Sequence, residues 1–306
     1  MAMKGSTKSR KKMGKRQLND CIAAYVFIGP VVLGLGIFYI WPFFQNIWFS
    51  FNDVNKFNMA TFVGLENYVK LFHDPQLWDA FLNTMKYIVI TMPITILLSL
   101  ITAALLNTNI KGKSIYRTLY FLPTVTMPVA VSLVWRWIFN GDFGLLNEVL
   151  GWFGAEGRSW LADPSTALYM VMIVAIWGGV GYNVIILLAG MQGISRTYYE
   201  AASIDGASPS TQFFKITIPL VSPSIFFISI TGMIGAFQVF DSIYMMVGID
   251  SPIYNKVLTM NALFYQNAFV HGYKGYAAAI SIFMFVIIMG VTVVQLIGQK
   301  KWVNYC

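Results

Sequence analysis

Few residues in this chain have the types and spacing that catalytic chemistry requires. The two histidines, His73 and His271, stand far apart in the sequence, and the two cysteines, Cys21 and Cys306, lie near opposite ends. A pair of cysteines so placed gives neither a disulfide framework nor the spacing of a metal site. The sequence therefore predicts no catalytic residue, no metal ligand and no cofactor bound by this chain.

The tripeptide Gly112-Lys113-Ser114 matches the end of a phosphate-binding loop. Such a loop has another glycine five positions before its second glycine, and it follows a β-strand. Here that position is Asn107, and apolar runs typical of helices flank the tripeptide. We interpret it as a basic turn, so the chain is not expected to be an enzyme that hydrolyses ATP by itself.

The composition and the long apolar stretches of the chain indicate a membrane protein. The chain has 306 residues, of which 57% are hydrophobic and 11% are charged, whereas soluble domains carry about 25% charged residues. A helix needs about 20 apolar residues to cross a bilayer. Six stretches qualify: Ile22–Phe49, Met85–Leu106, Ile115–Phe139, Ala167–Met191, Ile225–Val247 and Ala277–Ile297. The sequence predicts an all-α polytopic membrane protein with six transmembrane helices.

The distribution of charge predicts the orientation of these helices. If the N-terminus is cytoplasmic, the inner segments hold 14 Lys/Arg and 3 Asp/Glu, and the outer segments hold 5 Lys/Arg and 9 Asp/Glu. A basic excess on one side fits the positive-inside rule with both termini in the cytoplasm. The basic cluster Lys4–Arg16 is then an orientation signal, and we expect no nucleic-acid partner.

The first apolar run is longer than that of a signal peptide and lacks a small-residue cleavage site near its end. We expect an uncleaved first helix, in which Pro30 and Pro42 predict kinks or a broken outer end. The predicted parts are a basic cytoplasmic segment (1–21), a six-helix domain (22–299, with its core at about 83–299) and a cytoplasmic tail (300–306).

Ionisable residues within the predicted spans leave a second class of transporter open. Ion-gradient-driven transporters carry such residues in their helices, and the candidates here are Lys86, Arg136 and Asp241. Arg136 stands near the outer end of its span, where a long side chain can reach the interface. One acid in one span gives little support to a proton relay, so a secondary transporter is the alternative interpretation.

The loop from Ser195 to Pro219, between the fourth and fifth spans, predicts two short helices joined by a turn. Ser195 can cap the first helix, and Gly206 supplies the left-handed residue that ends it. Ser208 and Pro209 favour a second helix start, and Pro219 marks the turn into the fifth span. A knob that fits a partner and an amphipathic helix on the membrane are equally good interpretations of these residues alone.

The same loop resembles the EAA motif of binding-protein-dependent ABC importer permeases. Glu200-Ala201-Ala202, Gly206 and Ile216-x-Ile218-Pro219 stand at the motif's spacing, and Ile218 is a conservative departure from the family's leucine. The resemblance implies a coupling helix that docks in a cleft of a separate ATPase subunit. The residues expected to carry this coupling are Tyr199, Glu200, Ala201, Ala202, Asp205, Gly206, Ala207, Phe213, Ile216 and Pro219.

Weaker similarities to the MalF-like carbohydrate permeases extend over about residues 20–300, in segments that begin at Gly64, Arg117, Gly144 and Phe237. The resemblance implies the type I (MetI-like) ABC importer permease fold in the bacterial cytoplasmic membrane, in contact with lipid. It also implies a second, MalG-like permease, two ATPase subunits that bind ATP and Mg, an extracytoplasmic solute-binding protein and a carbohydrate substrate. It favours a heterodimer over a homodimer.

The fourth and fifth spans hold residues that suit a sugar path, because sugar sites combine hydrogen-bonding groups with aromatic faces. The residues expected along the path are Gly179, Tyr182, Asn183, Gly232, Gly235 and Gln238. From the sequence alone, small residues at helical spacing more often mark tight helix packing. The resemblance places four of the six, Gly179, Tyr182, Gly232 and Gly235, where maltose permeases line their sugar site. Glycines replace an aromatic and a hydroxyl there, so the sugar's identity does not transfer, and a polyol or glycerol phosphate ester is an alternative cargo.

Overall fold

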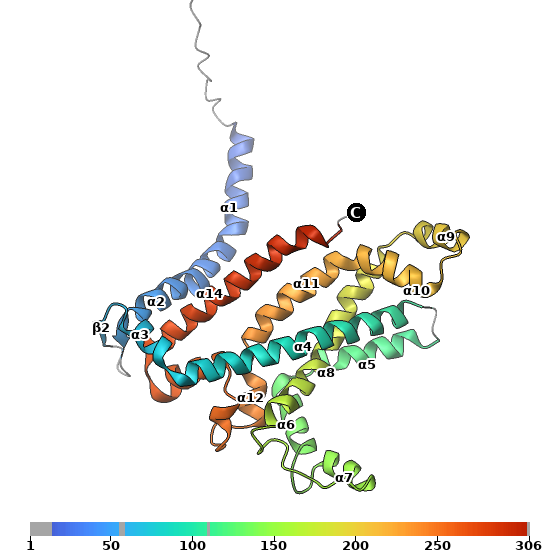
Figure 1. Cartoon of the computed structure of the whole chain (residues 1–306). Coiled ribbons are helices and arrows are strands. Elements are labelled where there is room, and N and C mark those ends of the chain that lie inside the picture. The colour runs from blue at the N-terminus through green and yellow to red at the C-terminus, as the bar shows by residue number, and fades with distance from the viewer. Residues whose placement is uncertain (1–13, 55–58, 109–110, 305–306) are drawn as a thin grey trace, which may run out of the picture.

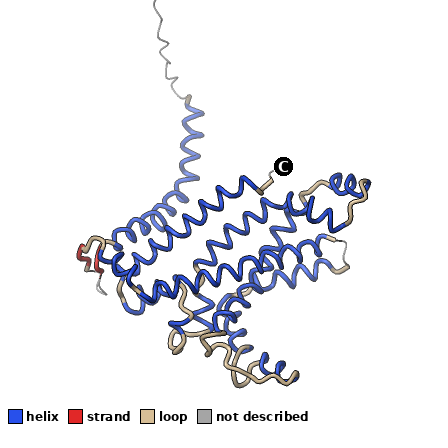
Figure 2. The backbone as a smooth tube through the Cα atoms, in the orientation of Figure 1, coloured by secondary structure: helices blue, strands red, loops and turns tan. Residues whose placement is uncertain are grey.

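The computed structural model describes residues 14–54, 59–108 and 111–304 (Figures 1 and 2). Most of the basic N-terminal cluster, and Cys306, lie outside the described residues. Long helices α4, α8, α11 and α14 form the body of the molecule, with α9 and α10 at one end and α12 toward the other (Figure 1). Among the described residues, five helices are long and apolar enough to cross a membrane, and there are six such spans if one bent pair of helices is counted as a single span.

The first span bends as its prolines predict. It consists of α1 (Lys15–Leu35), a π-helical turn η1 (Gly36–Ile40) and α2 (Trp41–Ser50). Pro42 has no N–H to bond the carbonyl four residues earlier, and the helix widens there so that the N–H of Trp41 donates to the carbonyl of Gly36. Figure 1 shows the change of direction, which leaves α1 standing away from the other helices.

The third span is two helices rather than one. Residues Lys113–Val125 form α5 and residues Pro128–Ile138 form α6, and the two are bent by 98°. Proline disfavours the helical conformation in the residue before it, and Met127 is extended, with φ −58° and ψ 123°. The stretch Ile115–Phe139, predicted as one span, is therefore divided into two helices near Met127.

The fifth span differs from the prediction at both ends. The helices α10 (Pro209–Gln212), η2 (Phe213–Thr217) and α11 (Ile218–Phe237) form one helix from Pro209 to Phe237, so the chain does not turn at Pro219. Its C-terminal end is Phe237 and not Val247, since α12 (Asp241–Met246) is a separate helix. The carbonyls freed at this end are bonded from elsewhere: Asn261 donates to Gln238 and Thr259 to Val239.

The remaining spans lie close to their predicted bounds. They are α4 (Pro75–Asn107), α8 (Ala167–Gln192) and α14 (Lys274–Gly298). The carboxylate of Asp74 caps α4 by accepting from the N–H of Gln76. The other described elements are β1 (Asn52–Val54) and β2 (Ala60–Phe62), which pair antiparallel, α3 (Glu66–His73), α7 (Leu145–Trp152), α9 (Arg196–Ile204), η3 (Tyr254–Lys256), α13 (Met260–Tyr265), η4 (Gln266–His271) and η5 (Gln299–Lys301).

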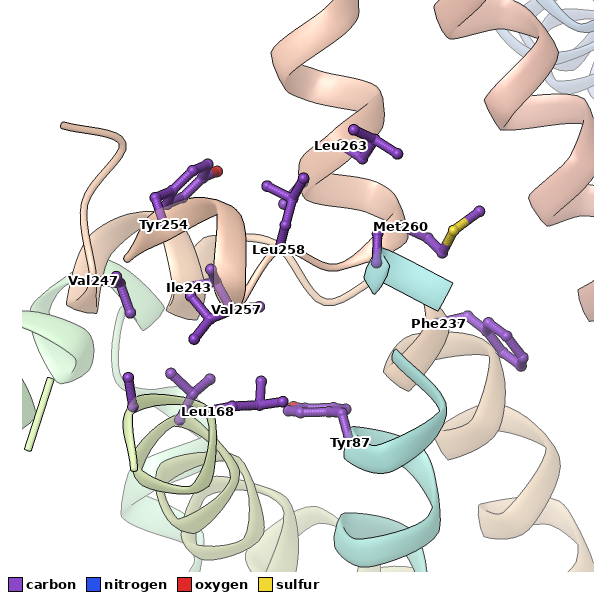
Figure 3. Close-up of a cluster of buried hydrophobic side chains, with 14 of the residues drawn as sticks. Tyr87, Leu168, Phe237, Ile243, Val247, Tyr254, Val257, Leu258, Met260 and Leu263 are labelled. Carbon is purple, nitrogen blue, oxygen red and sulfur yellow. The ribbon is translucent and has the colours of Figure 1, made fainter. Parts of the chain in front are cut away.

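A buried apolar cluster joins the segment after α11 to the ends of α4 and α8. Figure 3 shows Leu258, Met260 and Leu263 on one side of it and Tyr87 and Leu168 on the other. The chain between α12 and α13 is held there because the side-chain amide of Asn83 donates to the carbonyls of Lys256 and Leu258, at 2.9 and 3.0 Å. Burial also raises the pKa of Tyr254 to about 12. This cluster fixes the segment that closes one end of the site described next.

Candidate functional site

A cavity of about 450 Å³, named here the central cavity, lies between α4, α8, α11 and the segment that follows α11. Its lining includes all six residues that the sequence predicts for a substrate path: Gly179, Tyr182, Asn183, Gly232, Gly235 and Gln238. The aromatic ring of Tyr182 is 47% exposed, and the amides of Asn183 and Gln238 provide both donors and acceptors. These groups suit a polar cargo that presents hydroxyls and an apolar ring face.

The helix α4 contributes a wall of the cavity that sequence reasoning missed. Tyr87, Thr91 and Thr95 all line it, and their spacing of four residues places them on one face of the helix. The hydroxyl of Thr91 donates to the carbonyl of Tyr87 at 2.7 Å, which satisfies it within an apolar span. Polar residues repeated at this spacing in an otherwise apolar run are the signal that could have identified this wall.

The three glycines that line the cavity differ in how closely they pack against neighbouring helices. A Cβ added at Gly179 would lie 3.1 Å from Cγ2 of Thr95, and one added at Gly232 would lie 2.7 Å from Cε of Met92. A Cβ added at Gly235 would meet nothing within 4 Å. The packing interpretation therefore holds for Gly179 and Gly232, which touch α4, whereas Gly235 leaves open space in the lining.

Asp241 is the one charged side chain among the described residues that line the central cavity. It begins α12 just beyond α11, and its side chain is exposed. Arg136 belongs to a different pocket, lined also by Asn140, Asp142 and Asp250, and its guanidinium lies 3.5 Å from the carbonyl of Met245. The two ionisable residues thus line separate pockets, one at each end of α12.

The loop from Ser195 to Pro219 has the caps that its sequence predicts. The side chain of Ser195 accepts from the N–H of Thr197, and that of Ser208 accepts from the N–H of Thr211. Gly206 is left-handed, with φ +75°. Each cap depends on residues within a few positions of the helix end, which is why the sequence was sufficient to predict it.

Two side-chain contacts tie α9 to the long helix that follows. The hydroxyls of Tyr199 and Thr217 are 2.9 Å apart, and the amide of Gln212 donates to the hydroxyl of Ser203 at 3.1 Å. The exposed members of the predicted coupling set are Glu200, Ala201, Asp205 and Gly206, and the partly buried ones are Tyr199, Ala202, Ala207, Phe213, Ile216 and Pro219. The loop therefore presents small and acidic residues outward and anchors itself with the others.

The tripeptide at Gly112 does not sit in the context of a phosphate-binding loop. Gly112 has φ +76° and immediately precedes α5, and the described strands, β1 and β2, are far from it in the sequence. In the described part of the chain, no group of three or more His, Cys, Asp or Glu side chains could hold a metal ion.

Comparison with known proteins gives the family. Residues 68–303 match the model of the family described as "Binding-protein-dependent transport system inner membrane component". The chain is 32% identical over 306 residues to the probable ABC transporter permease protein YesP of Bacillus subtilis, covering 99% of this chain and 98% of that protein. It is 32% identical over 281 residues to the sn-glycerol-3-phosphate transport system permease protein UgpA of an Escherichia coli strain, covering 92% and 93%.

The fold has counterparts among solved structures. A chain of a bacterial ABC transporter involved in the import of the acidic polysaccharide alginate matches with a TM-score of 0.81, at 20% sequence identity, and covers 94% of this chain and 99% of that chain. At this sequence identity, the similarity supports the fold only. Together, the family match and the relatives show that this chain belongs to the inner membrane components of binding-protein-dependent transport systems and is the permease subunit of an ABC importer.

Proposed function

We propose that this permease carries a neutral carbohydrate, in particular an oligosaccharide, through the central cavity. The observation that supports this most is the meeting of Tyr182, Asn183 and Gln238 around one space of about 450 Å³. An aromatic face and amide groups match a cargo with apolar ring faces and many hydroxyls. The cavity of this chain is half of the path, and a second, MalG-like permease supplies the other half.

The proposal places ATP hydrolysis in other subunits. Two ATPase subunits bind ATP and Mg²⁺, and the loop 195–219, called the docking loop from here on, fits a cleft on one of them. Glu200, Ala201 and Asp205 are exposed on α9, and small residues let another surface approach closely. The ties from Tyr199 and Gln212 make the loop stiff enough to carry force into α11.

The proposed orientation puts both termini and the docking loop in the cytoplasm. The excess of Lys and Arg in the inner segments supports this. A solute-binding protein then delivers the cargo to the opposite face, which carries the β1–β2 hairpin, α3 and α7.

The charge of the central cavity favours a neutral cargo over a phosphate ester. The relative UgpA is named for sn-glycerol-3-phosphate transport, which makes an anionic cargo the second candidate. Asp241 is the one charged group among the described lining residues, and no lysine or arginine is among them. A carboxylate beside an anion is unfavourable in a confined site, so this half of the path supports a neutral sugar.

The test is transport by the complete importer, with this permease, its second permease, the ATPase and the binding protein in proteoliposomes. Uptake is measured for labelled neutral oligosaccharides, glycerol and sn-glycerol-3-phosphate. We expect uptake of an oligosaccharide, and we expect Tyr182→Ala to slow it about fivefold, since stacking on an aromatic face contributes about 1 kcal/mol. The matched control is Tyr169→Ala, because Tyr169 lies on the same helix with 49% exposure but does not line the cavity.

Three results would contradict the proposal. Uptake of sn-glycerol-3-phosphate without uptake of any oligosaccharide would assign the second cargo class. Equal kinetics for Tyr182→Ala and Tyr169→Ala would remove Tyr182 from the path. Transport that persists without ATP and collapses with the ion gradient would mean that the energy does not come from an ATPase.

A further inference from the structure

The long helix Pro209–Phe237 has a weak point where the docking loop joins α11. In an α-helix, each carbonyl accepts a hydrogen bond from the N–H four residues later. For the carbonyl of Pro219 that residue is Pro223, which has no N–H. The ladder is also irregular just before this point, because Phe213–Thr217 is a π-helical turn. Any force from the docking loop must cross this stretch before it reaches the cavity.

Donors from outside the helix ladder replace the missing bond. The hydroxyl of Ser222 donates to the carbonyl of Pro219 at 2.6 Å, and the side-chain amide of Asn304 lies 3.5 Å from the same oxygen. The backbone N–H of Asn304 donates to the oxygen of Ser222 at 2.9 Å. Ser222 is buried and Asn304 is exposed, so the C-terminal segment completes a small hydrogen-bonded network at the surface of this turn.

The C-terminal segment holds the helix on both sides of Pro223. The ring of Trp302 packs edge-on against Phe226, with centroids 6.0 Å apart. Phe226 follows Ser222 by one turn of the same face. The contacts of Trp302 and Asn304 therefore extend from Pro219 to Phe226 and bridge the proline.

The other face of the same turn is fixed by α8. A Cβ added at Gly190 would lie 2.5 Å from the hydroxyl of Ser224 and 3.7 Å from Val221, so the two helices are in close contact there. With α8 on one side and the C-terminal segment on the other, the weak point cannot bend freely.

We propose that the segment Trp302–Asn304 holds the proline-weakened turn Pro219–Pro223 straight, and we call this segment the splint. Ser222 and Trp302 are then positioning residues for the coupling of the docking loop to the cavity. The proposal rests on the proposed docking of the loop 195–219 on an ATPase. With the splint, movement of the docking loop turns the cavity-lining part of α11. Without it, the loop moves and the helix yields at Pro219–Pro223, so ATP is hydrolysed with less opening and closing of the cavity.

The experiment uses the permease co-expressed with its second permease and ATPase, purified in lipid nanodiscs. A probe cysteine replaces Gly235, where the lining is open, and Cys21 and Cys306 are changed to serine. The rate at which a water-soluble maleimide labels the probe is compared without nucleotide and after trapping with ATP, Mg²⁺ and vanadate. ATP hydrolysis and co-purification of the ATPase are measured on the same samples.

We expect Ser222→Ala and Trp302→Ala to keep the ATPase bound and active while the nucleotide-dependent change in labelling falls about fivefold, as loss of one hydrogen bond or one ring contact would give. Ser222→Thr and Trp302→Phe should restore the change, because the hydroxyl and the ring return. The matched control is Ser229→Ala, since that hydroxyl lies on the same helix and its hydrogen bond, to the carbonyl of Ile225, stays within the helix.

The outcomes separate the splint from the docking proposal. A wild-type labelling change in both Ser222→Ala and Trp302→Ala would overturn the splint, and so would loss of the ATPase from these variants. If Ser222→Ala does not fold, Trp302→Ala and a chain that ends at Lys301 decide by the same criteria. The variant Gly206→Pro tests docking itself: if it keeps both the ATPase and the labelling change, the docking proposal is wrong.

Discussion

At the scale of single residues, the glycines of the central cavity show how one residue type serves two purposes. Gly179 and Gly232 allow α8 and α11 to approach Thr95 and Met92 of α4. Gly235 meets no neighbour, so its missing side chain adds to the space that a cargo can occupy. A larger residue at Gly179 or Gly232 should therefore disturb helix packing, whereas a larger residue at Gly235 should fill space in the cavity.

We predict that Gly235→Phe reduces uptake about tenfold or more while the amount of folded permease in the membrane stays unchanged. The added ring has room to enter the cavity, and it competes with the cargo for that space. Initial rates of uptake at several cargo concentrations measure the effect. Gly290→Phe is the control, because Gly290 also meets nothing within 4 Å but lies on α14 outside the cavity lining. Equal uptake by the two variants would contradict the prediction.

The sequence was sufficient to propose six residues that the structure brings around one cavity, and it was not sufficient to find the whole lining. Aromatic and amide side chains beside glycines in the fourth and fifth spans are a local pattern. The contribution of Tyr87, Thr91 and Thr95 depends on α4 packing against α8 and α11. That arrangement brings together residues far apart in the chain, so no local pattern specifies it.

At the scale of elements, the contact between α5 and α8 depends on one glycine. A Cβ added at Gly181 would lie 2.0 Å from the carbonyl oxygen of Tyr120 and 2.9 Å from the hydroxyl of Thr124. The first of these atoms belongs to the backbone of α5, which cannot rotate away as a side chain can. Gly178, on the same helix, would meet nothing within 4 Å.

We predict that Gly181→Ala destabilises the permease by about 1–3 kcal/mol, the usual cost of overpacking, and that Gly178→Ala has almost no effect. Thermal unfolding of the two purified variants in detergent, followed by size-exclusion chromatography, gives the comparison. A melting temperature for Gly181→Ala equal to that of Gly178→Ala would show that α5 can shift away from α8 without loss.

Helix caps, bends and helix ends differ in how far they could be predicted from the sequence. The caps at Ser195, Ser208 and Gly206 are set by neighbouring residues and were predicted. The bend between α5 and α6 also has a local cause, Pro128, which hydropathy alone overlooks. The C-terminal end of α11 was placed too late because apolar residues continue to Val247, although Gln238 and Asp241 interrupt them. The carbonyls freed at this end accept from Thr259 and Asn261, which are distant in the sequence.

At the scale of the whole molecule, the docking loop and the loop after α7 lie at opposite ends of the helix bundle (Figure 1). Ile204 in α9 is 87% exposed and Phe153 after α7 is 83% exposed. The positive-inside distribution predicts that the first faces the cytoplasm and the second faces outward.

We predict that a membrane-impermeant thiol reagent labels Phe153→Cys in intact cells and labels Ile204→Cys only after the membrane is opened. Both variants carry serine at positions 21 and 306. Labelling of both after opening is the control that each cysteine is reachable. The reverse pattern in intact cells would mean that the whole topology is inverted, and labelling of both would mean that the two positions are not separated by the bilayer.

The unbroken helix from Pro209 to Phe237 gives this permease a lever arm. At 1.5 Å per residue its 29 residues measure about 43 Å from end to end. A tilt of about 10° at the docking end would carry the far end through about 7 Å, and a spherical cavity of 450 Å³ is only about 9.5 Å across. In the proposed coupling, the length of this arm lets a small movement of the docking loop open or close the central cavity, provided that the arm stays straight.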